Sequence, residues 1–522
     1  MPHANSAKRE WRCDSDHALL FFRMLTIFCG GSLMNSPRLS ELCSKLLERD
    51  PAGQAVQFEG KWRNWGWVQS IARQVHRELE AIGGAPVSFV ARNHAAALAG
   101  LVGLLSQERT VRMIYAFQSP AAMAASIEKL GSPAVLLMES DLTPEIVAVV
   151  ERCGMRAIIL ADQGAGTAIA GPPREPEPTE GHPTIDILTS GTTGPPKQFP
   201  IRHDVFAHMM LNQGSPVLED PTAPPFMMAF PFGNIAGLSM LVGSFLQGQR
   251  IMLLERFSLE AWRDYVVTYR PTASGLPSSA IPMILDAKIP QENLASLKYI
   301  TTGAAPLDTA VQKRFQDTYD VRVLLIYGAT EFGGPVAGMT PALDAQWGDA
   351  KLGSSGQALP GAQLRVRDQE TGEILEGGGV GLLEVVSPRM GPEWIATSDL
   401  VRIDEDGFLY CIGRADGAIM RGGFKVLPES VEQVIRTHPA VASVAVVGLS
   451  DPVLHQVPVA VVQMRTGVEA PSVEDLKGFV REHLPSPHVP AMWRVVDNMP
   501  LNSAYKIDRA AVRALFETGS VS

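Results

Sequence analysis

Compact apolar runs recur along the first part of the chain, and segments with helical spacing separate most of them. The runs cover residues 87–90, 134–138, 157–160, 251–254 and 321–326. Apolar runs of this length are typical of parallel strands that are buried on both faces, and most of the intervals leave room for a crossover helix. The pattern therefore predicts an α/β fold built from doubly wound, mainly parallel sheets.

The pattern changes after residue 407, where glycines become frequent. Residues 429–437 then have the spacing of a helix, and residues 441–447 and 457–462 have the composition of strands. Ser472 and Asp475 form a capping-box pattern ahead of a second helix. We therefore expect a smaller α+β unit near the C-terminal end.

Two segments are expected to lie outside the packed elements. Residues 162–183 are rich in glycine, proline and glutamate, which predicts a surface connection rather than a helix or a central strand. The apolar stretch 18–29 is interrupted by Arg23 and is too short to span a bilayer. We therefore expect residues 1–35 to be a disordered extension, or to precede the true start codon, and we expect no stable membrane insertion.

Composition narrows the class of protein. The 522 residues are 46% hydrophobic and 19% charged, which is a globular balance, and the length favours more than one domain. The net charge of −10 gives no broad basic field that would attract nucleic acid. The five cysteines lack the spacing of a disulfide scaffold or a zinc site, so we expect a cytoplasmic protein. The oligomeric state stays open, a homodimer included.

Residues 189–197 combine hydroxyls, glycines and a lysine directly after a mainly apolar run. Glycines let backbone N–H groups approach phosphate oxygens, hydroxyls donate hydrogen bonds, and lysine adds positive charge. A generic loop of this composition is more often a plain surface loop. A P-loop would need serine or threonine after Lys197, where Gln198 stands. The candidate phosphate-binding residues are Thr189, Ser190, Gly191, Thr192, Thr193, Gly194 and Lys197.

The loop resembles the signature of the adenylate-forming superfamily, which includes acyl-CoA synthetases, and further segments resemble that family's other motifs in the same order. They are residues 302–306, 327–331, 398–399, 413–416 and 500–506. Each segment alone is a weak signal, whereas their ordered occurrence is a strong one. The resemblance implies a large domain of parallel sheets with a smaller distorted barrel (residues 36–414) and a small mobile α+β domain (residues 415–522).

The resemblance also implies roles for single residues. Lys506 would be the catalytic lysine, and Thr330 and Glu331 would meet phosphate and Mg²⁺. Asp399 would accept hydrogen bonds from both ribose hydroxyls. Asp416 would be the hinge about which the small domain turns. The other candidates on the nucleotide side are Gly303, Ala304, Ala305, Pro306, Tyr327, Gly328 and Arg414.

These roles imply a two-step acid-thiol ligase. A carboxylic acid would attack the α-phosphate of ATP, release pyrophosphate, and pass its acyl group from AMP to a thiol, with coenzyme A expected. Because only residues 507–522 follow Lys506, we expect a free thiol acceptor rather than an attached one. A separate carrier protein and a degenerate nucleotide-binding protein stay open as alternatives. The loop expected to face coenzyme A contains Arg421, Gly422, Gly423 and Lys425.

Two positions depart from the family pattern. Tyr505 stands where a glycine usually precedes the lysine, so Lys506 would enter the site at an altered angle. Asn234 stands in a segment where an aromatic residue and a histidine are common. Peptide-synthetase adenylation domains of the same superfamily place an aspartate near this segment to pair with an amino group, and residues 226–237 contain none, so the resemblance implies a fatty or aromatic acid. The candidate acyl-pocket residues are Asn234, Ile235, Gly237, Gly303, Gly328 and Ala329.

Overall fold

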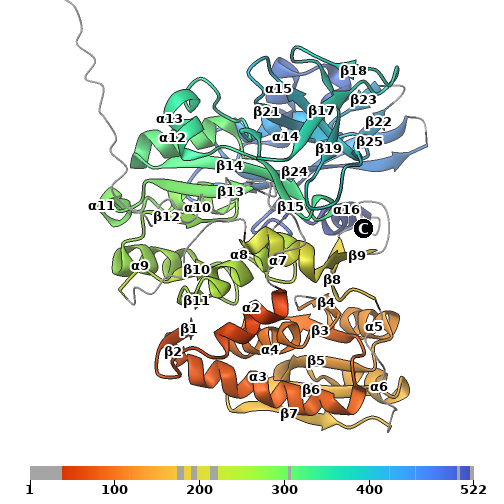
Figure 1. Ribbon diagram of the computed structural model, residues 1–522. Helices are drawn as coiled ribbons and strands as arrows, with labels where there is room; N and C mark the ends of the chain where they lie inside the picture. Colours follow the sequence, from red (N-terminus) through yellow and green to blue (C-terminus); the bar gives the residue numbers. More distant parts are fainter. Residues whose placement is uncertain are drawn as a thin grey trace, which may run out of the picture.

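The computed structural model of the protein is shown in Figure 1. It describes residues 38–116, 118–172, 181–189, 197–211, 222–303, 307–421, 424–452, 454–502 and 506–517. The expected extension at residues 1–35 lies outside this range and stays a prediction. Among the residues described, no helix has both the length and the apolar character needed to cross a membrane.

The largest sheet has the strand order β7-β6-β5-β3-β4-β8-β9. Strands β3 (Val87–Ala91), β4 (Val111–Tyr115), β5 (Ala134–Met138) and β6 (Arg156–Ala161) are parallel, and every residue of β3 and β5 is buried. Strand β8 (Thr184–Thr189) is parallel to β4, and β9 (Lys197–Arg202) is antiparallel to β8. Strand β7 (Gly164–Ile169) lies in the predicted connection, at the sheet edge where its glycines are tolerated.

Helices cover both faces of this sheet, as the apolar runs predicted. Phe89 of β3 packs in one core with α2 (Leu39–Leu46), α3 (Trp65–Leu79) and α4 (Ala95–Ser106). Val90 points to the opposite core, which contains α5 (Pro120–Leu130) and α6 (Pro144–Arg152). Because successive side chains of a strand face opposite sides, the apolar runs of β3 and β5 are buried throughout.

Two further sheets complete the centre of the molecule (Figure 1). The order β10-β11-β1-β2 joins β1 (Gln54–Phe58), β2 (Lys61–Asn64), β10 (Phe226–Met228) and β11 (Ile251–Leu253). The second sheet follows chain order through β12 (Ala273–Gly275), β13 (Tyr299–Gly303), β14 (Arg322–Ala329), β15 (Gly334–Gly338) and β16 (Gln357–Ala358).

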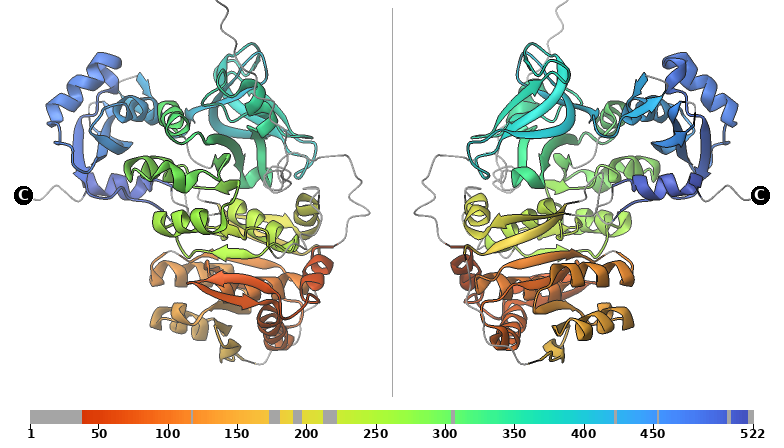
Figure 2. Two further views of the ribbon diagram at one scale, coloured as in Figure 1. Left: turned by 90° about the vertical axis from the view of Figure 1, so that its left-hand side faces the viewer. Right: turned by 90° about the vertical axis from the view of Figure 1, so that its right-hand side faces the viewer.

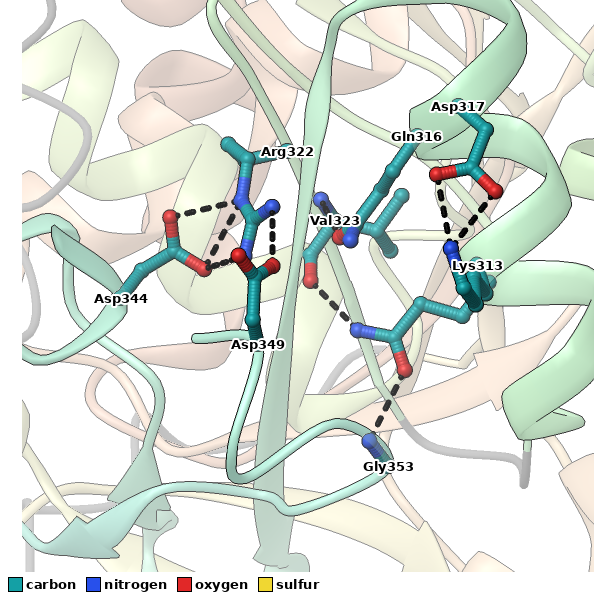
Figure 3. A network of polar contacts seen from close by, with 9 residues as sticks. Lys313, Gln316, Asp317, Arg322, Val323, Asp344, Asp349 and Gly353 are labelled. Carbon is teal, nitrogen blue, oxygen red and sulfur yellow. Dashed lines mark hydrogen bonds and ion pairs between the residues drawn. The ribbon is translucent and has the colours of Figure 1, made fainter. Parts of the chain in front are cut away.

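The helices of this central region are α7 (His203–Leu211), α8 (Ile235–Leu246), α9 (Leu259–Tyr269), α10 (Ala280–Asp286), α11 (Gln291–Leu294), α12 (Thr309–Tyr319) and α13 (Pro341–Trp347). Polar contacts hold α12 against β14 (Figure 3). Gln312 Nε2 donates to the Val323 carbonyl and Gln316 Oε1 accepts from the Val323 amide, both at 2.9 Å. Arg322, at the start of β14, pairs with Asp344 and Asp349 (Figure 3). These contacts fix the strand whose carboxyl end carries Tyr327.

An antiparallel sheet of order β18-β17-β19-β20-β21 follows. It contains β17 (Gln363–Arg367), β18 (Ile374–Leu375), β19 (Val380–Val386), β20 (Ile395–Ile403) and β21 (Leu409–Arg414). Val366, Leu383 and Val401 of this sheet share an apolar core with Val336 of β15. The core therefore joins β20 and β21 to the sheet that carries Tyr327.

The C-terminal unit is α+β, as predicted. Its sheet has the order β23-β22-β25-β24, with β26 beside β25, and Figure 2 shows it at one side of the larger unit. Its strands are β22 (Ile419–Arg421), β23 (Phe424–Val426), β24 (Val441–Asp451), β25 (His455–Met464) and β26 (Met492–Val496). Its helices are α14 (Pro428–Arg436), α15 (Val473–His483) and α16 (Arg509–Glu517). The predicted capping box of Ser472 and Asp475 begins α15.

Candidate active site

The carboxyl ends of β13 and β14 meet at a place where only glycine fits. A Cβ atom on Gly303 would lie 2.5 Å from the Ile326 carbonyl oxygen. A Cβ atom on Gly328 would lie 2.5 Å from Pro335 Cα and 2.6 Å from the Gly334 oxygen. Ligands of α/β sheets bind at the carboxyl ends of strands, so this close packing shapes a candidate binding edge.

We expect Gly328→Ala to lower the free energy of unfolding by about 1–3 kcal/mol, because the neighbours of the added methyl group are backbone atoms that cannot move aside. Gly338→Ala is the matched control, since a Cβ there would meet nothing nearer than Leu359 at 3.5 Å. Urea denaturation of both variants gives the comparison. Equal stability of the two variants would contradict the packing argument.

Tyr327 and Asp399 form the polar centre of this edge. The Tyr327 hydroxyl donates to Asp399 Oδ2 at 2.5 Å. Burial, and then the neighbouring Asp399 carboxylate, raise the pKa of Tyr327, so the phenol stays a neutral donor. Arg414, the partner of Asp399 across β20 and β21, donates to Asp399 Oδ1 at 3.3 Å. The carboxylate is thereby oriented from two sides.

Asp416 lies next to this centre, where the chain leaves the large unit. Arg414 Nε donates to Asp416 Oδ1 at 2.9 Å, and the Ser398 hydroxyl donates to Asp416 Oδ2 at 3.0 Å. Arg414 also donates to the Ser398 hydroxyl. The predicted hinge residue is thus hydrogen-bonded to residues that flank Asp399.

Lys506 comes from the C-terminal unit and lies at the same edge. Its amide donates to Asn502 Oδ1 at 3.1 Å and its carbonyl accepts from the Asn502 amide at 2.8 Å, which closes a short hairpin. Burial by surrounding protein and repulsion from Arg414 lower the pKa of Lys506, while Asp399 and Glu331 attract its ammonium. Solvent still reaches the side chain. Lys506 of the C-terminal unit therefore lies within electrostatic range of Asp399 and Glu331 of the large unit.

The lowered pKa of Lys506 predicts a pH dependence. An ammonium with a lowered pKa loses its proton at lower pH, so kcat/KM for ATP should fall on the alkaline side before the ordinary lysine value of about 10.4 is reached. Lys506→Arg keeps its charge throughout this range and should lose that alkaline limb. An unchanged limb in Lys506→Arg would show that another group titrates.

Part of the predicted site lies outside the described residues. This part contains Ser190, Gly191, Thr192, Thr193, Gly194, Ala304, Ala305, Pro306, Gly422, Gly423 and Tyr505. For Thr189, Lys197 and Lys425 the structure describes the backbone alone. Thr189 ends β8 and pairs with Lys197 at the start of β9, so the predicted phosphate loop begins and ends at the edge of the largest sheet.

Comparison with known proteins identifies the family. A family model described as AMP-binding enzyme matches residues 45–393, and a model of the AMP-binding enzyme C-terminal domain matches residues 430–506. The chain belongs to the AMP-binding enzyme family. It is 24% identical over 497 residues to fatty acid–[acyl-carrier-protein] ligase ScoC of Streptomyces coeruleorubidus. The aligned region covers 90% of this chain and 94% of that protein.

Two further comparisons agree with this membership. The chain is 29% identical over 352 residues to 2-succinylbenzoate–CoA ligase of Bacillus cereus, covering 63% of this chain and 70% of that protein. Its fold matches ATP-bound MatB from Rhodopseudomonas palustris with a TM-score of 0.74 at 21% identity, covering 92% of this chain and 99% of that chain. These matches confirm the predicted fold class of a large α/β unit followed by a smaller α+β unit.

In this AMP-binding enzyme, Glu331 is the predicted Mg²⁺ contact. It lies exposed in a 3₁₀ turn, η4 (Thr330–Phe332), directly after the end of β14. The described part of the chain holds no group of three or more histidine, cysteine or acidic side chains suited to a metal. A single carboxylate fits Mg²⁺ that arrives with a nucleotide, because Mg²⁺ takes one or two carboxylates together with substrate phosphates.

The predicted acyl-pocket residues of the AMP-binding enzyme have local structural roles. Asn234 is the N-cap of α8, and its side chain accepts from the Gly237 amide at 2.8 Å. A Cβ atom on Gly237 would lie 2.1 Å from the Pro231 oxygen. Ile235 is buried and Ala329 is half-buried. An asparagine before an apolar helix could have signalled the cap.

One residue that shapes this segment was missed by the sequence analysis. Asn93 follows β3 and is fully buried, and its amide nitrogen donates to the carbonyls of Phe230 at 2.8 Å and Leu254 at 3.1 Å. Its Oδ1 accepts from the Phe232 amide at 3.0 Å. Asn93 thus holds the turn before Asn234, and its place directly after a buried strand was the available signal.

Arg421, predicted on the coenzyme A side, already has partners. Its Nη1 donates to the carbonyls of Pro487 at 2.8 Å, Val489 at 3.1 Å and Ser486 at 3.3 Å. These contacts tie β22 to the turn η5 (Ser486–His488) within the C-terminal unit. A phosphate would have to share this guanidinium with three carbonyl groups.

Proposed function

We propose that the protein activates a fatty or aromatic carboxylic acid with ATP to an acyl-adenylate and then transfers the acyl group to coenzyme A. The observation that carries the proposal is that Lys506 of the C-terminal unit lies within electrostatic range of Asp399 and Glu331 of the large unit, while Tyr327 and Arg414 orient the Asp399 carboxylate by hydrogen bonds. Such a cation serves a reaction in which negative charge develops on a phosphoryl group.

In the first step a carboxylate oxygen attacks the α-phosphorus of ATP, and the bond from that phosphorus to the pyrophosphate oxygen breaks. Lys506 stabilises the charge that develops on the reacting oxygens. Asp399, oriented by Tyr327 and Arg414, accepts hydrogen bonds from the ribose hydroxyls and holds the nucleotide. Glu331 is the residue that would hold the Mg²⁺ arriving with ATP, and that ion would supply neutralisation of the phosphate charge.

In the second step the sulfur of the thiol attacks the acyl carbon. The bond between that carbon and the AMP oxygen breaks, the thiol proton is released, and a thioester and AMP are the products. AMP leaves readily because its phosphate stabilises the negative charge, whereas a free carboxylate has no such leaving group. The better leaving group of the acyl-adenylate is the chemical reason why the reaction consumes ATP.

A carrier protein is the second candidate acceptor, and a specific observation favours it. The relative that matches over 90% of this chain is named as an acyl-carrier-protein ligase, whereas the 2-succinylbenzoate–CoA ligase covers 63%. Arg421 is also engaged by three carbonyls, which weakens one expected contact to coenzyme A. Both acceptors present a thiol on a slender arm, so both fit the same second step.

The test is an assay of the full chain with Mg-ATP and a panel of fatty, aryl and alicyclic acids. Each acid is tested alone, with coenzyme A, and with a phosphopantetheinylated carrier protein, and pyrophosphate and thioester are measured. Acid-dependent pyrophosphate with acyl-CoA supports the proposal. Acyl-AMP that is converted only when the carrier protein is present supports the second candidate. No acid-dependent pyrophosphate with any acid contradicts both.

A further inference from the structure

An ion pair between Arg465 and Asp286 joins the C-terminal unit to the large unit. Arg465 Nη1 contacts Asp286 Oδ1, and the two residues are 179 positions apart. Asp286 is the last residue of α10 in the large unit. Arg465 directly follows β25 in the C-terminal unit, where its amide donates to the Ala440 carbonyl at 2.9 Å. The side chains are 19% and 42% exposed for Arg465 and Asp286 respectively, so the contact is partly shielded from water.

On the large unit, Asp286 is connected to the nucleotide side of the active site. Helix α10 packs against α12, and the Tyr319 hydroxyl of α12 donates to the Ile284 carbonyl at 3.2 Å. Helix α12 is held to β14 through the buried glutamines, and β14 ends at Tyr327. The position of the Asp286 carboxylate is therefore fixed relative to Tyr327.

On the C-terminal unit, Arg465 is connected to the hairpin of Lys506. Gln463, near the end of β25, donates to the Asp497 carbonyl at 2.9 Å and accepts from the Met499 amide at 3.4 Å. Met499 packs in one core with β25 and with Ile507, which pairs with Leu501 across the hairpin. The guanidinium is thus fixed relative to the hairpin that presents Lys506.

We propose that Arg465 and Asp286 are positioning residues that hold the C-terminal unit with Lys506 in the active site during adenylation. The inference rests on the proposed function, because it assigns the pair to the step in which Lys506 acts. A partly exposed ion pair contributes little to the stability of the whole fold. The same small free energy is enough to shift a nearly balanced equilibrium between two placements of one unit by a few fold.

The predicted effect is confined to the first half-reaction. We expect Arg465→Ala and Asp286→Ala each to lower kcat for acyl-adenylate formation by about fivefold, with KM for ATP changed less than twofold, which corresponds to the upper range of a partly exposed ion pair. Thioester formation from supplied acyl-adenylate should be unchanged. The charge exchange Arg465→Asp with Asp286→Arg should recover part of the loss.

A double-mutant cycle separates positioning from a general structural role. In a Lys506→Ala background, Arg465→Ala should cause no further loss, because the residue acts through Lys506. Lys313→Ala is the surface control, since Lys313 forms an exposed ion pair with Asp317 on α12 and should leave both half-reactions unchanged. The same fivefold loss in the Lys506→Ala background, or equal loss in both half-reactions, would overturn the proposal.

A measurement without turnover keeps the inference distinct from the proposed function. Arg465→Cys with Asp286→Cys should be joined by a short bifunctional thiol reagent that spans the length of the lost ion pair, and Arg465→Cys with Lys313→Cys should be joined less. If the wild type shows no acid-dependent pyrophosphate, the proposed function fails and the positioning role fails with it, whereas the crosslink still reports the contact. If the wild type is active and no crosslink forms, the positioning role alone is overturned.

Discussion

Lys506→Ala lowers the rate of acyl-adenylate formation by about 10²- to 10³-fold, the loss typical of removing one electrostatic donor from a reacting phosphoryl group. The reason is local, because the ammonium lies within electrostatic range of Asp399 and Glu331, and its removal leaves the developing charge on the reacting oxygens without a positive partner. Acid-dependent pyrophosphate release under single-turnover conditions measures the loss.

The matched control for this prediction is Lys313→Ala, which removes an exposed lysine paired with Asp317 on the surface of α12. It should keep the wild-type rate. Thioester formation from supplied acyl-adenylate should also persist in Lys506→Ala. A Lys506→Ala variant that releases pyrophosphate at the wild-type rate would contradict the assignment of Lys506.

Asp399→Ala weakens binding of ATP and AMP by roughly 10²-fold. Hydrogen bonds to a charged acceptor contribute about 1.5–3 kcal/mol, and this carboxylate is expected to accept from both ribose hydroxyls. The substitution also leaves the Tyr327 hydroxyl and Arg414 without their shared partner. Calorimetric titration with AMP measures the affinity, with circular dichroism as a check on folding.

Asp406→Asn is the control for the second prediction. Asp406 is a half-exposed carboxylate that pairs with Lys351, so its loss removes a charge without touching the Tyr327 and Asp399 centre. It should bind AMP as the wild type does. If Asp399→Ala binds AMP normally while the control is also normal, the ribose contact lies elsewhere.

Much of the fold follows from local pattern. The apolar runs at 87–90, 134–138 and 157–160 correspond to β3, β5 and β6, because strands buried on both faces need apolar residues at every position. The capping box before α15 was visible for the same local reason. The antiparallel strands β17, β18, β20 and β21 carried no comparable signal, since strands that are mostly half-exposed resemble loops over a few residues.

The site was predictable as a set of residues, and its contacts were not. Ordered motifs pointed to Tyr327, Asp399 and Lys506, but the hydrogen bond of Tyr327 to Asp399 and the electrostatic influence of Asp399 on Lys506 depend on how separate elements pack. The pairing of Arg465 with Asp286 left no trace in the sequence, because each is an ordinary charged residue 179 positions from the other. Asn234 is an acyl-pocket candidate by resemblance, and the structure adds that its side chain caps α8.

The most direct test of the central claim follows the fate of a carboxylate oxygen. The enzyme is supplied with ATP, a thiol and an acid from the panel that supports turnover, with both carboxyl oxygens labelled with ¹⁸O. If the acid attacks the α-phosphorus and the thiol then cleaves the acyl bond, AMP carries one labelled oxygen from the acid. Unlabelled AMP, or release of ADP and phosphate in place of AMP and pyrophosphate, would contradict an acyl-adenylate mechanism.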